Sequence, residues 1–291
     1  MTPQHATSPH ASIPERPTTF RFGPAGQQCC GTFRPAGSQH AAAPKPPVLL
    51  CQPYGQEAIR TQRLFRALGD RLGAKGHPVL RFDYFGTGDA DGDDTDGCMA
   101  TWVDNIVTAH EALQSWSGQS TAIWVGLRLG ATLAAKASAR AAKPPAKLVL
   151  WDPVHDGPTY LQELFDSSDR NMNDSLAQNW HRVKPALARA EGPGPVQASG
   201  FELSEALVSE LSAIDVQAFS GVQARQITLL KPAAHEAAHP VTTALLRNGF
   251  LCKEVATTER IDWASDEAMG TAIVPTGLMT QLLAEMDSVR A

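Results

Sequence analysis

The sequence predicts an α/β fold built on one mostly parallel sheet. Short apolar runs at residues 47–51, 78–83 and 147–152 are typical of strands that are buried on both faces. Helical patterns lie between these runs, and strands that alternate with helices favour a parallel sheet. The third observation is residues 121–135, which read as an apolar strand, a glycine-bounded turn and a helix of small residues.

The composition is that of an ordinary globular protein. Of the 291 residues, 43% are hydrophobic and 19% are charged, and the formal net charge is −5. This charge gives no basic footprint for nucleic acid, and no apolar run approaches the roughly 18 residues that span a bilayer. The five cysteines are an odd number without metal-binding spacing. We therefore expect reduced thiols, a cytoplasmic location, no nucleic-acid partner and no membrane span; the oligomeric state stays open.

The chain is expected to form one domain after a short tail. Residues 1–17 are rich in Pro, His, Ser and Thr and lack an apolar core, which predicts a disordered tail and no signal peptide. Residues 18–291 form the predicted domain. It begins with two extended segments, 18–22 and 28–33, around a Gly-Pro-Ala-Gly turn that indicates a hairpin.

Helices are expected between the next strands. Their apolar positions recur every three or four residues, as on one face of a helix. The first helix carries Leu64, Phe65, Leu68 and Leu72, and the second carries Trp102, Ile106, Ala109 and Leu113.

A long insertion is predicted after the strand that ends at Asp152. Residues 155–222 show helical patches and no strand pattern, so we expect a helical cap there. Beyond it, the patterns predict strands at 226–230 and 250–255 and helices near 240–248 and 276–289.

The turn at residues 126–130 has the glycine spacing of a nucleophile elbow, G-x-S-x-G, in which a strained strand-to-helix turn presents a serine. Gly126 and Gly130 are present, but the central residue is Arg128. A guanidinium stays protonated and has no lone pair with which to attack a carbonyl.

Five segments carry a family resemblance: residues 53–57 (PYGQE), 81–89 (RFDYFGTGD), 126–131 (GLRLGA), 150–154 (LWDPV) and 199–204 (SGFELS). Through them the chain resembles α/β-hydrolases of the serine-aminopeptidase-like group. More narrowly, it resembles the second of two hydrolase families associated with exosortase A systems in bacteria. This resemblance implies the α/β-hydrolase fold, an arginine in the elbow, and a link to exopolysaccharide and envelope export.

The catalytic base of a serine hydrolase is missing from its expected place. In this fold the histidine follows the last strand, but residues 256–265 contain none, and no histidine follows His239. The sequence therefore does not support Ser-His-Asp chemistry, and whether the protein is an enzyme stays open.

An oxyanion hole can persist without the triad. The backbone N–H of Leu129 follows the elbow residue, and a second N–H is expected from Tyr54 or Gly55.

Arg128 itself has two interpretations. It anchors the anionic group of a ligand, or it forms a structural ion pair with Glu57 or Asp152. Both predict a carboxylate partner, because a lone buried arginine is costly. These three residues are the candidate functional side chains.

The sequence also contains a metal-binding motif in a context that disfavours a metal site. Residues 235–239 read H-E-x-x-H, in which His235 and His239 share a helix face in metalloproteases. Pro240 would interrupt that helix, and a third ligand would have to be Glu254 or Glu259. We therefore expect the match to the H-E-x-x-H motif to be a coincidence, and we expect the protein to bind no metal and no cofactor.

Several further residues are weaker candidates for a functional role. Glu236 lies where the fold places its catalytic acid. Cys51 and His155 could act as a replacement nucleophile and base. A buried thiol is favoured for Cys51. The acidic residues 89–97 lack the glycine and glutamate of a calcium loop and are interpreted as a solvated loop, and Asp83 as a turn cap.

The sequence leaves three functional hypotheses. The first is a protein with a degenerate triad that binds or processes a small-molecule or carrier-linked acyl or glycosyl intermediate of envelope or exopolysaccharide biosynthesis. The second is a non-catalytic binding or scaffold protein. The third is a metal-dependent hydrolase that uses His235 and His239.

Overall fold

The computed structural model describes residues 16–40, 43–176, 179–191, 196–232, 238–257 and 276–287. Eight strands form one sheet in the order β1-β2-β4-β3-β5-β6-β9-β10. Their bounds are β1 Thr18–Phe22, β2 Cys29–Arg34, β3 Val48–Cys51, β4 Val79–Asp83, β5 Ile123–Leu127, β6 Lys147–Trp151, β9 Gln226–Lys231 and β10 Cys252–Ala256.

The sheet is antiparallel only at its N-terminal end. Strand β2 pairs antiparallel with β1 and with β4, and every other pair is parallel. The predicted hairpin and the mostly parallel sheet are therefore confirmed. The central strands β3, β5 and β6 are buried at every residue, which explains why their sequences are apolar except for Lys147, whose ammonium group pairs with Glu285.

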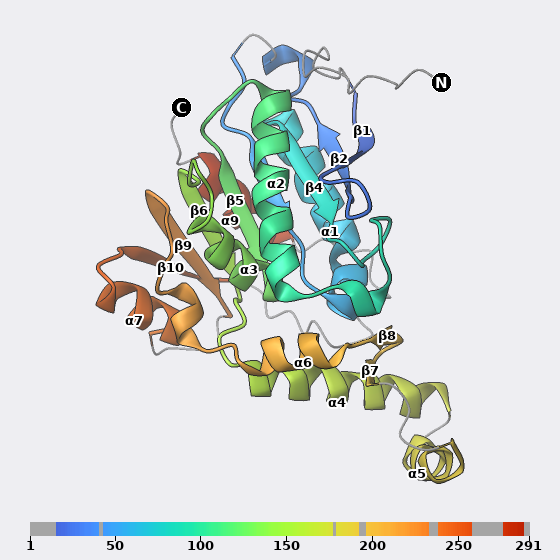
Figure 1. The fold of residues 1–291 in the computed structure, drawn as a ribbon. Coiled ribbons are helices and arrows are strands. Elements are labelled where there is room, and N and C mark those ends of the chain that lie inside the picture. The colour runs from blue at the N-terminus through green and yellow to red at the C-terminus, as the bar shows by residue number, and fades with distance from the viewer. Residues whose placement is uncertain are drawn as a thin grey trace, which may run out of the picture.

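Two apolar clusters sandwich the sheet. Helices α1 (Gly55–Ala74) and α9 (Thr276–Asp287) cover one face, where Val48 and Leu50 contribute from β3. Helices α2 (Met99–Ser117), α3 (Leu129–Ser138) and α7 (Pro240–Arg247) cover the other, where Leu49 and Cys51 contribute. Figure 1 shows α2 in front of the sheet and α1 behind it. The alternation along β3 follows from the two-residue period of a strand.

The described residues between β6 and β9 are here called the insertion. They form α4 (Gly157–Ser175), α5 (Trp180–Glu191), β7 (Gln197–Ala198), β8 (Phe201–Glu202), α6 (Glu205–Ser212) and the 3-10 helix η3 (Val216–Phe219). Helices α4 and α6 run side by side beneath the main body, and α5 lies furthest out (Figure 1). Short 3-10 helices also occur at η1 (Ser38–His40) and η2 (Asp94–Asp96).

The prediction that the insertion lacks strands is wrong. Strands β7 and β8 form an antiparallel hairpin around Ser199 and Gly200, which have φ angles of 53° and 88°. Each strand is two residues long, so neither shows the alternation by which a strand is recognised.

Two other sequence predictions are limited by the described ranges. Residues 1–15 of the expected tail lie outside them, and β1 starts at Thr18. Among the described residues, no helix combines the length and apolar character needed to cross a bilayer.

Helix α9 is fastened to the main body by Asp287 at its C-terminal end. The Asp287 carboxylate contacts Lys45 Nζ at 2.5 Å and Lys75 Nζ at 2.8 Å. Partial burial acts to raise the pKa of Asp287, but hydrogen bonds from the two ammonium groups outweigh it and lower the pKa to about 2, from an ordinary value of 3.8. A lowered folded-state pKa contributes stability above the unfolded value, and this contribution is lost as pH falls.

We therefore expect Asp287→Asn to lower the free energy of unfolding at pH 7 and to weaken its decline between pH 4 and pH 2. Urea unfolding at a series of pH values measures both. Asp104→Asn, in an exposed ion pair with Arg140, is the surface control. An unchanged pH profile in Asp287→Asn would show that this contact does not stabilise the fold.

Candidate functional site

The predicted elbow forms between β5 and α3 with an arginine at its centre. Arg128 has φ 52° and ψ −123°, a conformation that a residue with a side chain rarely adopts and that costs on the order of 1–3 kcal/mol. The turn is held by its backbone, because Arg128 N donates to Trp151 O at 2.9 Å and Arg128 O accepts from Ala131 N at 3.0 Å.

Both flanking glycines are sterically required. A Cβ atom at Gly126 would lie 2.5 Å from the Cα of Ala131, and one at Gly130 would lie 2.3 Å from the carbonyl oxygen of Gln52. The strand, the turn and the preceding loop are therefore packed backbone against backbone, as the glycine spacing in the sequence indicated.

Arg128 is surrounded by three carboxylates. Its Nε lies 2.9 Å from Glu57 Oε1, its Nη1 lies 3.5 Å from Asp152 Oδ2, and its Nη2 contacts Glu163. Glu57 comes from the first turn of α1, Asp152 follows β6, and Glu163 belongs to α4. These four residues are here called the elbow ion cluster. The predicted carboxylate partners are present, and Glu163 is an additional one.

Tyr160, one helical turn before Glu163, completes the surroundings of Arg128. The centre of its ring lies 5.4 Å from the guanidinium carbon, within range of a cation–π contact. Its hydroxyl donates to Glu57 Oε2 at 3.2 Å. Helix α4 thus contacts both the cation and one of the carboxylates.

The elbow ion cluster is buried on its inner side and open on its outer side. The side chains of Glu57, Arg128 and Asp152 are 10%, 13% and 19% exposed, whereas that of Glu163 is 51% exposed. Burial raises the pKa of Glu57, and the charge of Arg128 opposes that rise. Burial acts to lower the pKa of Arg128, but the surrounding carboxylates raise it above its ordinary value, so the guanidinium stays charged.

This charge balance limits what the cluster binds. Among the described residues, one guanidinium faces three carboxylates, so a fourth anion would add to the negative charge that they carry. At about 5 Å and an effective dielectric constant of about 20, each unit of like charge costs about 3 kcal/mol. An anion therefore binds here only if it takes the place of a carboxylate already present.

The predicted oxyanion residues lie at the same edge of the sheet. Strands β3 and β5 are neighbours, with Cys51 opposite Gly126, so the loops that follow them emerge side by side. Gly55 starts α1 with φ 60° and Leu129 starts α3. The first N–H groups of a helix have no acceptor within the helix, so this edge offers donors. Their use as an oxyanion hole stays a prediction.

The Tyr54 side chain does not belong to an open oxyanion site. Its ring packs against Trp102 and Phe201, with ring centres 5.1 and 6.1 Å away. Its hydroxyl is buried and has no hydrogen-bond partner among the described residues. Burial raises the pKa of this phenol, so it stays neutral.

The H-E-x-x-H segment lacks the helical geometry at its second histidine. His239 precedes α7 and caps it, with Nδ1 accepting from Val241 N at 3.2 Å. Glu254 accepts from His239 N at 2.9 Å and pairs with Lys231. The other candidates, His235, Glu236 and Glu259, lie outside the described residues. Within the described ranges, no three His, Cys, Asp or Glu side chains are grouped as metal ligands.

Among the described residues, no hydrogen bond joins Cys51 and His155, the alternative nucleophile and base. Cys51 is fully buried at the end of β3, and burial raises its pKa far above the ordinary value, which disfavours the reactive thiolate. His155 packs edge to face against His239 instead, with ring centres 4.7 Å apart.

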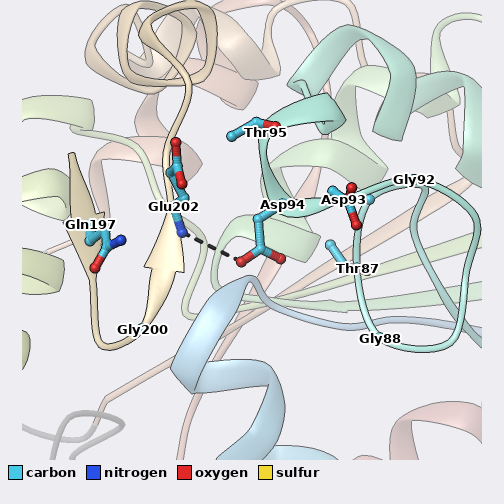
Figure 2. Close-up of a pocket in the computed structure, with 10 residues that line it drawn as sticks. Thr87, Gly88, Gly92, Asp93, Asp94, Thr95, Gln197, Gly200 and Glu202 are labelled. Carbon is cyan, nitrogen blue, oxygen red and sulfur yellow. Dashed lines mark hydrogen bonds between the residues drawn. The ribbon is translucent and has the colours of Figure 1, made fainter. Parts of the chain in front are cut away.

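Asp83 caps a turn, as predicted, by accepting from Gln52 Nε2 at 2.7 Å and from Asp89 N at 3.1 Å. The acidic loop that follows is mostly exposed, as expected, and it faces the β7–β8 hairpin, where Glu202 N donates to Asp94 at 3.4 Å. Between them lies a polar pocket of about 530 Å³ (Figure 2). Its wall includes carboxylates, hydroxyls and an amide, from Thr87, Asp93, Asp94, Thr95, Gln197 and Glu202.

No family model matches this chain, and no curated protein matches it. Solved structures do match over nearly their full length. The chain is similar to Est1E from Butyrivibrio proteoclasticus with ferulic acid bound, with a TM-score of 0.62, 15% identity and coverage of 93% of this chain and 100% of that chain. For a thermostable carboxyl esterase from Bacillus coagulans the TM-score is 0.60 at 12% identity, and the match covers 93% of this chain and 99% of that chain. For a proline iminopeptidase from Mycobacterium smegmatis the TM-score is 0.58 at 11% identity, and the match covers 93% of this chain and 98% of that chain.

These similarities establish the architecture. The esterases and the iminopeptidase are α/β-hydrolases, and the strand order, the single antiparallel end and the elbow after β5 agree with that fold. The chain therefore has the α/β-hydrolase fold.

Proposed function

We propose that this protein is a non-hydrolytic member of the α/β-hydrolase fold that binds a small-molecule or carrier-linked ligand at the carboxyl edge of its sheet. The observation that carries the proposal is Arg128, a charged and largely buried side chain in an intact elbow. In this proposal the backbone of the elbow keeps its shape, but the side chain at its centre binds an anionic group instead of attacking a carbonyl.

The residues argue against hydrolysis. Arg128 offers no nucleophile, and the sequence has no histidine after His239 to act as the base that follows the last strand. Triad members act as a unit, and loss of the nucleophile alone typically lowers kcat by about a millionfold.

The ligand class follows from the resemblance and from a neighbour of the same fold. The family resemblance supports an acyl- or glycosyl-type intermediate of envelope or exopolysaccharide biosynthesis, handled in the cytoplasm. Est1E holds ferulic acid, which carries a carboxyl group and an aromatic ring. Arg128 would suit the carboxyl group of such a molecule.

A second candidate is a scaffold that binds no small molecule. The elbow ion cluster favours it, because the cluster ties α4 of the insertion to α1 and to the end of β6. In that case Arg128 serves only to hold these elements together, and no carboxylate or acyl compound binds with measurable affinity.

The catalytic prediction is tested with p-nitrophenyl esters and acyl thioesters. We expect hydrolysis at the uncatalysed rate, and the same for Arg128→Ser, because the base is also missing. A fluorophosphonate probe should label no serine. Turnover that is abolished in Arg128→Lys, a variant that keeps the charge, would overturn the proposal. A labelled serine would place a nucleophile elsewhere.

A further inference from the structure

Glu163 is the outer member of the elbow ion cluster. Glu57 and Asp152 reach Arg128 from the main body and are largely buried, whereas Glu163 reaches it from α4 and is half exposed. Glu163 therefore covers Nη2 of Arg128 on the side that faces solvent. A molecule that approaches the guanidinium from solvent meets this carboxylate first.

Of the three carboxylates, Glu163 is the one that leaves most easily. Glu57 is held by a second hydrogen bond, from the hydroxyl of Tyr160 at 3.2 Å. Asp152 is part of the turn after β6, where its backbone N donates to Leu230 O at 2.8 Å. Glu163 has Arg128 as its one hydrogen-bond partner within the described ranges, and its exposed carboxylate regains water when it moves away.

We propose that Glu163 is a built-in competitor that occupies the binding position of a ligand carboxylate on Arg128. This inference rests on the proposed ligand-binding function and adds to it the class of ligand. Exchange of one monoanionic carboxylate for another leaves the charge of the cluster unchanged, whereas simple addition of an anion does not. A phosphate dianion would add negative charge, so the site selects a carboxylate.

The ring of Tyr160 supports Arg128 from within. It lies 5.4 Å from the guanidinium carbon and is only 2% exposed, so it offers no surface to a ligand. The preference that the geometry supports is therefore for the carboxylate group itself and not for the body of the molecule that carries it.

The test compares ferulate, octanoate, acetate and inorganic phosphate by isothermal titration with the full chain. If Glu163 blocks Arg128 most of the time, its removal raises the competent fraction, so Glu163→Gln should bind ferulate or octanoate at least about tenfold more tightly than the unaltered protein. The affinity for acetate should change in the same direction, and phosphate should not bind.

Two variants make the result specific. Glu205→Gln removes an exposed glutamate of the insertion that starts α6, and it should change the affinity less than about twofold, since exposed charges are screened by salt. Glu163→Gln/Arg128→Lys should lose the gain, because the planar donor pair is gone. A thermal melt confirms that each variant is folded.

Each failure has a distinct meaning. Equal or weaker binding by Glu163→Gln, with measurable binding by the unaltered protein, overturns the competitor inference and leaves the proposed function in place. No binding of any carboxylate by either protein overturns both and favours the scaffold. A gain for phosphate as large as that for ferulate refutes the preference for a carboxylate.

Discussion

Replacing Arg128 by alanine is expected to lower the free energy of unfolding by about 3–5 kcal/mol, the usual range for removal of one partner of a buried ion pair. The variant removes the guanidinium from Glu57 and Asp152 in a site where neither carboxylate is well solvated. Since domains are stable by only about 5–15 kcal/mol, this loss is a large fraction of the total. Urea unfolding at pH 7 measures it.

Two control variants show whether the loss of stability comes from the burial of the ion pair and from the uncompensated charge. Arg140→Ala removes a surface pair with Asp104, whose side chains are 54% and 67% exposed, and should cost less than about 1 kcal/mol. Adding Glu57→Gln to Arg128→Ala should restore part of the loss, because one uncompensated charge disappears. If Arg128→Ala cost no more than Arg140→Ala, the elbow ion cluster would not stabilise the fold.

Replacing Gly130 by alanine is expected to cost at least about 3 kcal/mol, the upper part of the range for overpacked cores. The new methyl group would lie 2.3 Å from the carbonyl oxygen of Gln52 and 2.5 Å from that of Cys51. Both atoms belong to the backbone at the end of β3, so no side-chain rotation relieves the clash. A lower melting temperature and a reduced soluble yield are the expected results.

Gly69→Ala is the matched control for this change. Gly69 is also a buried helical glycine, in α1, but a Cβ atom there would lie 3.7 Å from the nearest atom, a methyl carbon of Val79. Alanine should stabilise this helix by about 0.4–1 kcal/mol, because it restricts the unfolded chain. Gly130→Ala with normal stability would contradict the close packing of the elbow against the loop after β3.

The sheet could be predicted because its central strands are buried on both faces. Such strands are apolar along nearly their whole length, as in β3, β5 and β6, where Lys147 is the one charged residue, and that pattern is visible without a structure. The hairpin of β7 and β8 could not be predicted, since two residues cannot show a period. It is defined instead by the turn at Ser199 and Gly200 and by contact with the distant Asp94.

The candidate site was predictable where it depends on strand ends. Residues that follow neighbouring parallel strands meet at one edge, so Arg128 and Asp152 were expected to be close. Glu163 was missed because it lies 35 residues away from Arg128 on a helix of the insertion, whose position no local pattern determines. The one available signal was its place one turn after the buried Tyr160, on the edge of the apolar face of α4.

The elbow also bears on which substitutions this chain tolerates. Its glycines and its backbone suit a serine at position 128, so Arg128→Ser is expected to leave the turn unaltered. The change removes the guanidinium from Glu57 and Asp152, so it is expected to lower the stability. On the proposed function it also brings no hydrolysis, because no histidine follows His239. A single change at this position would therefore lose stability and gain nothing.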